Sequence, residues 1–188
     1  MSKAYVLLAE GFEEVEALAT VDVLRRAGVE TVMVSINPQK QMVCGSHNIN
    51  VYADKCFGPQ DEYAASEFID GNAVILPGGK RGTENLAVCS PVHDLIKSYY
   101  YAGKLVCAIC AAPTVPAMDG ILDGLEVTCY PGFEDRLADA IYVDEPVRVT
   151  GNIITGRSMG TAVEFGLAIA EKLAGREIAN KVAASLHR

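Results

Sequence analysis

Short, almost wholly apolar runs alternate with amphipathic stretches along this chain, and this alternation restricts its fold more than any other feature. The first run, at residues 4–9, is followed by a stretch at 13–27 that begins with acids, ends with two arginines and stops at Gly28. Acids at the start and cations at the end are typical of an α-helix. A short continuous apolar run is typical of a strand buried on both faces, as in a parallel sheet.

The same alternation continues to the end of the chain. The pattern predicts strands at 29–36, 41–44, 49–52, 73–76, 105–109, 126–129, 147–149 and 153–155. It predicts helices at 83–88, 92–102, 161–173 and 177–186, and another that begins at Ala111. The turn at Gly151 and Asn152 indicates a hairpin between the last two strands. We therefore expect one α/β domain over residues 1–188, a mostly parallel sheet with helices on both faces, or three-layer sandwich.

The charge balance and the longest apolar run exclude two classes of partner. Sixteen Lys and Arg residues stand against 24 Asp and Glu residues, for a net charge of −8. Proteins that coat nucleic acid or bind anionic membranes need a basic face, so we expect neither partner. The longest nearly apolar run, at 105–118, contains two prolines and is shorter than the roughly 20 residues of a transmembrane helix. The first residues do not resemble a signal peptide, which predicts a cytoplasmic location.

The six cysteines are expected to be reduced thiols, because disulfides are rare in the cytoplasm. Cys107 and Cys110 match the C-x-x-C pattern of redox proteins, in which the first cysteine opens a helix. Here Cys107 falls within a predicted strand. Residues three apart on a strand lie roughly 10 Å apart, beyond the roughly 7 Å that a disulfide allows between Cα atoms. We therefore interpret Cys107 as a core residue, and the histidine spacing predicts no metal site.

Functional residues of such a sheet lie beyond the carboxyl ends of its strands. Cys110 lies at one such end, between the strand at 105–109 and the next predicted helix. Unpaired N–H groups at a helix N-terminus stabilise a thiolate and lower a cysteine pKa. Gly78 and Gly79 follow another strand and would let backbone N–H groups approach a ligand, as in an oxyanion hole. The alternatives are a small core cysteine and an ordinary loop.

Glu16 falls on the apolar side of the first predicted helix. A rotation of about 100° per residue places it between Val23 and Ala27. A carboxyl group on a buried face has a raised pKa and stays protonated unless it is paired. A neutral Glu16 could donate a hydrogen bond to a thiolate or pass protons to a substrate. Glu13 shares the same arc, and a solvated or capping carboxylate remains the alternative.

Five motifs in the correct order resemble the ThiJ/PfpI superfamily, in its branch of DJ-one protein deglycases. They are AEGFEEVE at 9–16, VDVLRRAG at 21–28, ILPGG at 75–79, AICAAPT at 108–114 and TGRSMGT at 155–161, followed by Glu164 and Phe165. The resemblance implies a flavodoxin-like fold, a homodimer and a reactive, easily oxidised Cys110 with a protonated Glu16 as its partner. It also implies an anion pocket at Gly78 and Gly79, formed by the N–H groups of Gly79 and Ala111.

Three departures from the family pattern affect the site. Members with a protease-like centre carry His directly after the cysteine, where this chain has Ala111, so protease activity is not expected. Many deglycase relatives have His before the Pro of the following strand, where this chain has Tyr130. A histidine base is then missing unless His47 reaches the pocket, for example across a dimer. Met159 replaces a usual proline and Pro116 interrupts the next helix, which alters local details of the pocket and dimer.

The sequence therefore favours a cysteine-dependent glyoxalase or protein deglycase that requires no cofactor, metal, glutathione or nucleotide. Cys110 would add to a small 2-oxoaldehyde such as methylglyoxal, and Glu16 would move a proton between its two carbons. The alternative is a redox-sensing stress protein or chaperone that uses oxidation of Cys110. A role near thiamine metabolism rests only on the naming history of the family.

Overall fold

The centre of the molecule is a seven-stranded sheet in the order β10-β11-β7-β6-β1-β2-β5. The computed structural model describes residues 2–58 and 65–187. Neighbouring strands of this sheet are parallel except β10 and β11, which form the predicted antiparallel hairpin. Its strands are β1 (Lys3–Leu8), β2 (Glu30–Ser35), β5 (Lys55–Cys56), β6 (Ala73–Leu76), β7 (Leu105–Ile109), β10 (Val147–Thr150) and β11 (Ile153–Gly156).

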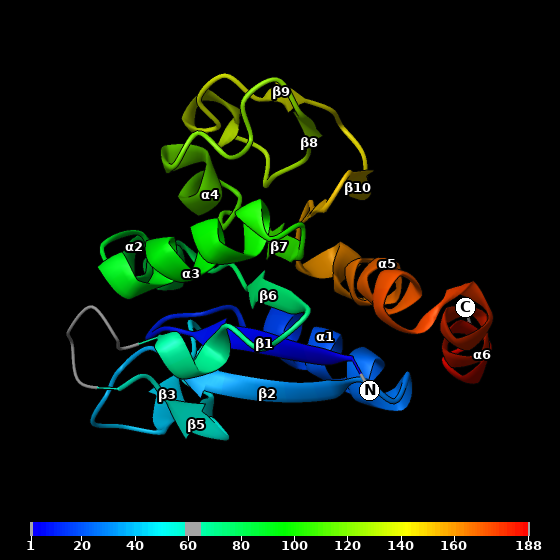
Figure 1. The fold of residues 1–188 in the computed structure, drawn as a ribbon, viewed down its shortest axis with the longest axis horizontal. Helices are drawn as coiled ribbons and strands as arrows, with labels where there is room; N and C mark the ends of the chain where they lie inside the picture. Colours follow the sequence, from blue (N-terminus) through cyan, green and yellow to red (C-terminus); the bar gives the residue numbers. More distant parts are fainter. Residues whose placement is uncertain (1, 59–64, 188) are drawn as a thin grey trace.

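Helices cover both faces of this sheet, which gives the molecule three layers (Figure 1). Successive side chains of a strand point to opposite faces, so Tyr5 and Leu7 pack into one core while Val6 and Leu8 pack into the other. The first core lies under α2 (Lys80–Ala87), α3 (Ser90–Tyr101) and α4 (Thr114–Met118), the second under α1 (Glu14–Arg26), α5 (Ala162–Ala174) and α6 (Arg176–Ser185). The predicted flavodoxin-like α/β fold is therefore confirmed.

Two small sheets lie outside the central one. The predicted strands at 41–44 and 49–52 form a hairpin of β3 (Met42–Cys44) and β4 (Asn50–Tyr52). The strand predicted at 126–129 is shorter, because β8 (Glu126–Val127) pairs with β9 (Ile141–Tyr142) and the N–H of Thr128 donates instead to Thr155 Oγ1. Short 3₁₀ helices complete the structure: η1 (Ser66–Phe68), η2 (Glu134–Arg136) and η3 (Met159–Thr161).

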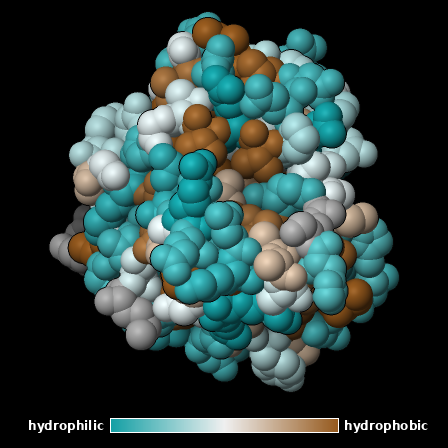
Figure 2. Space-filling view, turned by 90° about the vertical axis from the view of Figure 1, so that its right-hand side faces the viewer, coloured by the Kyte–Doolittle hydropathy of each residue, from teal (hydrophilic) through white to brown (hydrophobic). Residues whose placement is uncertain are grey.

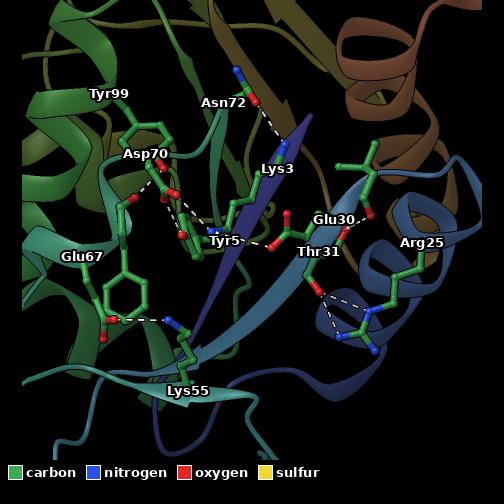
Figure 3. A network of polar contacts seen from close by, with 12 residues as sticks. Lys3, Tyr5, Arg25, Glu30, Thr31, Lys55, Glu67, Asp70, Asn72 and Tyr99 are labelled. Atoms are coloured by element: carbon green, nitrogen blue, oxygen red, sulfur yellow. Dashed lines mark hydrogen bonds and ion pairs between the residues drawn. The ribbon is translucent and has the colours of Figure 1, made fainter. Parts of the chain in front are cut away.

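A polar network fastens the amino end of β1 to the segment that precedes β6 (Figure 3). The buried Tyr5 hydroxyl donates to Asp70 Oδ1 at 2.5 Å, and Lys3 Nζ lies 3.0 Å from Asp70 Oδ2. Tyr99 donates its hydroxyl proton to the carbonyl of Phe68 at 2.6 Å. A Cβ at Gly71 would lie 2.4 Å from Tyr99 Oη, so only glycine fits between these rings. The network fixes the end of the sheet opposite to the strand ends that carry Cys110 and Gly78.

One face of the molecule, on the side of α6, carries its apolar residues in small groups (Figure 2). On the side of α6 and the C-terminus, hydrophilic residues predominate and hydrophobic ones form separate clusters (Figure 2). No helix within residues 2–58 and 65–187 is long and apolar enough to cross a membrane.

Candidate active site

Cys110 occupies a strained turn directly after β7. Its φ of 66° lies in the left-handed region, which a residue with a side chain adopts only when its surroundings hold it there. Both of its backbone groups are held: the N–H donates to the carbonyl of Gly156 at 2.9 Å, and the carbonyl accepts the N–H of Tyr130 at 2.8 Å. The turn therefore fixes the direction of the half-buried Cys110 side chain.

Glu16 approaches this cysteine from the first turn of α1. Its exposed fraction is 1%, as its place on the apolar arc predicts. Glu16 Oε2 accepts the N–H of Gly78 at 2.8 Å, whereas Oε1 is buried without a well-aligned partner in the described part of the chain. The Cys110 side chain lies beside this carboxyl group and hydrogen-bonds with it. The structure thus brings together the two residues that the sequence singled out.

The paired glycines allow the end of β6 to approach both side chains closely. A Cβ at Gly78 would lie 2.6 Å from Cys110 Cβ and 2.7 Å from Glu16 Oε2. Gly79 has a φ of 84°, and a Cβ there would lie 2.4 Å from the carbonyl oxygen of Gly11. The N–H groups of Gly79 and Ala111 both point toward the Cys110 sulfur and lower its pKa. The N–H of Gly78 instead binds Glu16, so the donors for an anion are those of Gly79 and Ala111.

The ionisation of the two side chains is linked. Burial raises the pKa of Glu16 to about 7, although hydrogen bonding with Cys110 opposes the rise. Burial and the negative charge of Glu16 raise the pKa of the Cys110 thiol to about 12. Because the two groups interact, these values belong to successive proton losses from the pair. The pair therefore holds one shared proton between about pH 7 and about pH 12.

This proton arrangement corrects the expectation that a helix N-terminus lowers the pKa of Cys110. The helix that was predicted to begin at Ala111 begins at Thr114, and the intervening residues form tight turns with hydrogen bonds such as Ala112 N–H to Ile109 O at 3.1 Å. The helix α4 is only five residues long. The local N–H groups of Gly79 and Ala111, and a proton on Glu16, are what stabilises a thiolate here.

His47 does not reach the cysteine within this chain. It lies in the turn between β3 and β4 and donates its backbone N–H to Glu14 Oε1 at 2.6 Å. Its Nδ1 lies 2.9 Å from Glu14 Oε2, and its side chain is 71% exposed. Hydrogen bonding with Glu14 raises the pKa of His47. His47 therefore connects the hairpin to the first turn of α1.

Tyr130 is a direct neighbour of Cys110, through its backbone. Its N–H donates to the Cys110 carbonyl, while its ring is 46% exposed and meets Phe133 edge-on at 6.2 Å between ring centres. The side chain therefore lies at the outer side of the site.

One group of side chains among the described residues has the spacing of metal ligands: Glu13, Glu14 and His47, whose candidate atoms lie within 4.8 Å of one another. These atoms already have partners. Both oxygens of Glu14 accept hydrogen bonds from His47 and Ser46, and Glu13 Oε2 accepts the N–H of Glu16 at 2.6 Å. The protein itself therefore satisfies the hydrogen bonding of this cluster.

Three further residues contribute to the site through contacts that the sequence did not predict. The N–H of Met159 lies near the Glu16 carboxyl group and lowers its pKa. Glu13 caps α1 by accepting the N–H of Glu16, and its charge raises the pKa of Glu16. The Gly156 carbonyl holds Cys110. These contacts join segments far apart in the chain, and only the acid at the start of a helix is a recognisable signal.

Comparison with protein families identifies one that matches almost the whole chain. The model of the DJ-1/PfpI family matches residues 2–172. Protein dj-1beta of Drosophila melanogaster is 41% identical over 189 aligned positions, which cover 99% of this chain and 97% of the relative. The glutathione-independent glyoxalase DJR-1.2 of Caenorhabditis elegans is 32% identical over an alignment that covers 96% of this chain and 93% of the relative.

Solved structures agree with this result. The crystal structure of Drosophila melanogaster DJ-1beta superposes with a TM-score of 0.89 at 40% identity, covering 99% of this chain and 98% of that one. Toxoplasma gondii DJ-1, in an oxidized form, superposes with a TM-score of 0.90 at 33% identity and the same coverage.

Proposed function

Because the chain belongs to the DJ-1/PfpI family, we propose that it is a cofactor-free glyoxalase whose nucleophile is Cys110. Its substrates are small 2-oxoaldehydes such as methylglyoxal, or, as a protein deglycase, their early adducts with thiols and amines. One observation carries the proposal: the strained Cys110 turn faces a buried carboxyl group that titrates near neutral pH. A group with such a pKa is suited to proton transfer at physiological pH.

The first step is addition of the sulfur to the aldehyde. Below about pH 7 both members of the pair are protonated, and above it the remaining proton is shared. When the proton moves from Cys110 to Glu16, the sulfur attacks the aldehyde carbon and the former carbonyl oxygen becomes negative. The N–H groups of Gly79 and Ala111, which point toward the sulfur, would stabilise this charge. Proton return from Glu16 to the oxygen gives a neutral hemithioacetal.

The second step is an internal proton transfer that needs no external oxidant. Glu16, again a carboxylate, removes the hydrogen on the carbon that bears sulfur, and the electron pair forms an enediolate. The proton is then delivered to the neighbouring carbon, and the hydroxyl proton on the carbon that bears sulfur passes to the other oxygen, which converts the hemithioacetal into the thioester of a hydroxy acid. Hydrolysis by water releases lactate from methylglyoxal and restores the thiol. In a deglycase reaction the sulfur attacks the hemithioacetal or aminocarbinol carbon of the adduct, the bond from that carbon to the modified thiol or amine breaks, and a proton from Glu16 leaves with the restored thiol or amine.

Lactate formation tests the proposal. Purified protein is incubated with methylglyoxal without glutathione, and lactate is measured over time. We expect activity in the natural chain, none in Cys110→Ala, and a loss of about 10²–10⁴-fold in Glu16→Gln, the usual contribution of a general acid–base. Cys56→Ala, which changes a thiol in the edge strand β5, is the matched control and should remain active. Equal lactate production by the natural chain and Cys110→Ala would exclude the mechanism.

Oxidation of Cys110 is a second candidate function. The Gly79 and Ala111 N–H groups that face the sulfur could hold a sulfinate, and a solved relative carries the description oxidized. Peroxide would transfer one oxygen to the thiolate to give a sulfenic acid and hydroxide, and a second equivalent would give the sulfinic acid. After brief peroxide treatment, peptide mass spectrometry should find oxygen on Cys110 before the other five cysteines. If another cysteine reacts first, the sensor function is excluded.

We also propose that the protein is a homodimer in the cytoplasm. Six free thiols suit a reducing compartment. Several large apolar side chains remain exposed around α1 and the β3–β4 hairpin, and such a group supports an interface between copies. They are Val15 and Leu18 of α1, and Met42, Ile49 and Tyr52 of the hairpin.

A further inference from the structure

A hollow separate from the Cys110 site lies at the carboxyl ends of β1 and β2. Its volume is about 860 Å³, within the range of small-molecule sites. Its lining includes Glu10 from the turn after β1 and Arg81 from α2, but not Cys110, Glu16 or Gly79. The site of the proposed glyoxalase activity therefore does not account for it. In open α/β sheets, this edge of the sheet is where ligands bind.

The walls of the hollow are apolar and its rim is polar. Ile36, Pro38 and Val88 present accessible apolar surface to it, whereas Leu8, Val43 and Phe57 are at most 3% exposed. The rim carries the side-chain amides of three residues after β2 and in α2, namely Asn37, Gln39 and Asn85. Apolar walls with a few placed polar groups are the usual character of a small-molecule site.

Arg81 is the only cation that lines the hollow among the described residues. The aliphatic part of its side chain packs closely on Gly11. A Cβ added to Gly11 would lie 2.7 Å from Arg81 Cβ and 3.1 Å from Arg81 Cδ. In residues 2–58 and 65–187 the guanidinium group forms no ion pair, unlike those of Arg25 and Arg26. Among the described residues no acid pairs with this guanidinium, which lies at the mouth of the hollow.

The acid in the lining does not neutralise this cation. Glu10 Oε2 accepts the backbone N–H of Cys44 at 3.3 Å, and the Glu10 carbonyl accepts Asn85 Nδ2 at 2.7 Å. These bonds tie Glu10 to the hairpin and to α2. Arg81 therefore remains the group that can receive a negative charge from a ligand.

We propose that this hollow binds a small organic anion with an apolar body, such as an aryl or branched aliphatic carboxylate or sulfonate. The acid group pairs with the guanidinium of Arg81, which suits a planar, two-oxygen partner. The apolar body contacts Ile36, Pro38 and Val88. This site is additional to the glyoxalase function and does not depend on it.

Binding of 1-anilinonaphthalene-8-sulfonate, a fluorescent aryl sulfonate, tests the proposal on the folded full chain. We expect saturable binding to one site, weakened about tenfold by Arg81→Gln, which keeps the Cβ, Cγ and Cδ atoms that pack on Gly11. Arg176→Gln on α6 removes the same charge from an 80% exposed side chain and is the matched control, expected to bind as the natural chain does. Circular dichroism of each variant verifies that the fluorescence does not come from an unfolded form.

Cys89 provides an independent location test, because it lines the hollow and is half-buried. Burial raises the pKa of its thiol, so alkylation with N-ethylmaleimide is carried out at alkaline pH and quantified by peptide mass spectrometry. The sulfonate should slow alkylation of Cys89 and leave Cys110 unaffected. Absence of saturable binding, protection of Cys110 in place of Cys89, or equal affinity in Arg81→Gln and Arg176→Gln would each overturn the proposal.

Discussion

At the scale of single residues, the unusual feature is a titratable carboxyl group in the core. Glu16 is 1% exposed, and burial raises its pKa to about 7 from an ordinary value of 4.5. A raised carboxyl pKa means that the folded state prefers the protonated form. Its stabilising effect is complete below about pH 4.5 and is lost as the pH rises through about 7. The proposed catalytic form of the site is therefore less stable than its acidic form.

Glu16→Gln should remove this pH dependence. Glutamine keeps a carbonyl oxygen for the N–H of Gly78 and cannot ionise. The free energy of unfolding of the natural chain should fall by about 3 kcal/mol between pH 4.5 and pH 8 relative to that of the variant, since one unit of pKa corresponds to about 1.4 kcal/mol. Urea unfolding of both proteins across this range measures the difference. Parallel stability curves would contradict a raised pKa for Glu16.

Gly78→Ala should reduce activity more than it reduces stability. The new methyl group would lie 2.6 Å from Cys110 Cβ and 2.7 Å from Glu16 Oε2, so it must push the two side chains apart. Misplacement of reacting groups by about 1 Å can cost about 100-fold in rate. Methylglyoxal kinetics should show a fall mainly in kcat. Gly124→Ala is a control in which no atom lies within 4 Å of the new methyl group; its φ of 70° makes the alanine strained and lowers stability, but the folded variant should retain activity.

The sequence predicted Glu16 and Cys110 but could not predict how they are held. Helical periodicity places Glu16 on the buried arc, and the end of an apolar strand places Cys110 at the crevice. Neither signal reveals that Glu14, on the same turn, is also buried, because its burial depends on the distant hairpin that binds it. The positive φ of Cys110 depends on Gly156 and Tyr130, which are remote in the chain.

At the scale of secondary-structure elements, α1 and the β3–β4 hairpin are joined by one ion pair. Burial raises the pKa of Glu14, but hydrogen bonds from His47 and Ser46 outweigh it and lower the pKa to about 2. A lowered carboxyl pKa contributes stability above about pH 4.5, which is lost as the pH falls toward 2. The raised pKa of His47 contributes stability at low pH, and this stability is lost as the pH rises through the pKa of His47 in the folded protein. The junction is therefore strongest in mildly acidic solution, when both groups are charged.

Glu14→Gln should destabilise the protein by about 1–3 kcal/mol near pH 5.5, the usual cost of leaving a hydrogen-bonded charged group without its partner. Glutamine preserves size but cannot accept from His47 and Ser46 with a full charge. His47→Gln keeps the backbone bond to position 14 and isolates the ring contribution. Thermal unfolding at pH 5.5 and pH 9 measures both variants. The natural chain should differ in stability between pH 5.5 and pH 9 more than either variant does. If both variants show the same difference as the natural chain, the Glu14–His47 ion pair does not stabilise the protein.

Predicted and observed elements differ where tertiary contacts decide the boundary. The strands at 73–76 and 105–109 were predicted to the residue, because apolar runs end at Pro77 and at the cysteine turn. The helix after Cys110 begins three residues late, since its first residues form the tight turns that bring Ala111 N–H to the sulfur. The edge strand β5 was missed, because only two residues pair with β2.

At the scale of the whole molecule, the site is assembled from the carboxyl ends of four strands. Gly11 follows β1, Gly78 follows β6, Cys110 follows β7 and Gly156 ends β11. These strands are neighbours in the sheet only because the chain crosses over between them. The alternation of apolar and amphipathic stretches was sufficient to predict a mostly parallel sheet with helices on both faces, but not the order of its strands. It could not predict the small β8–β9 sheet, whose pairing of two residues leaves almost no pattern.

The proposed homodimer requires an exposed apolar surface that a second copy can cover. Met42 and Tyr52 are opposite each other in the β3–β4 hairpin and are 42% and 70% exposed, and Leu18 on α1 is 38% exposed. Because the Glu14–His47 pair holds this hairpin against α1, these apolar residues form a preformed surface that a second copy could cover. Light scattering should give twice the 20.0 kDa chain mass for the natural protein and one chain mass for a Leu18→Glu, Tyr52→Lys variant.

Tyr101→Lys is the matched control for this experiment. Tyr101 is 78% exposed at the end of α3, in the opposite helical layer, so its replacement introduces the same charge as Tyr52→Lys without touching α1 or the hairpin. We expect this variant to keep twice the chain mass, because an interface loses affinity only when a contacting residue changes. If the natural chain has the mass of a monomer, the dimer is excluded. If Tyr101→Lys dissociates the dimer and the double variant does not, the interface lies on α3 instead.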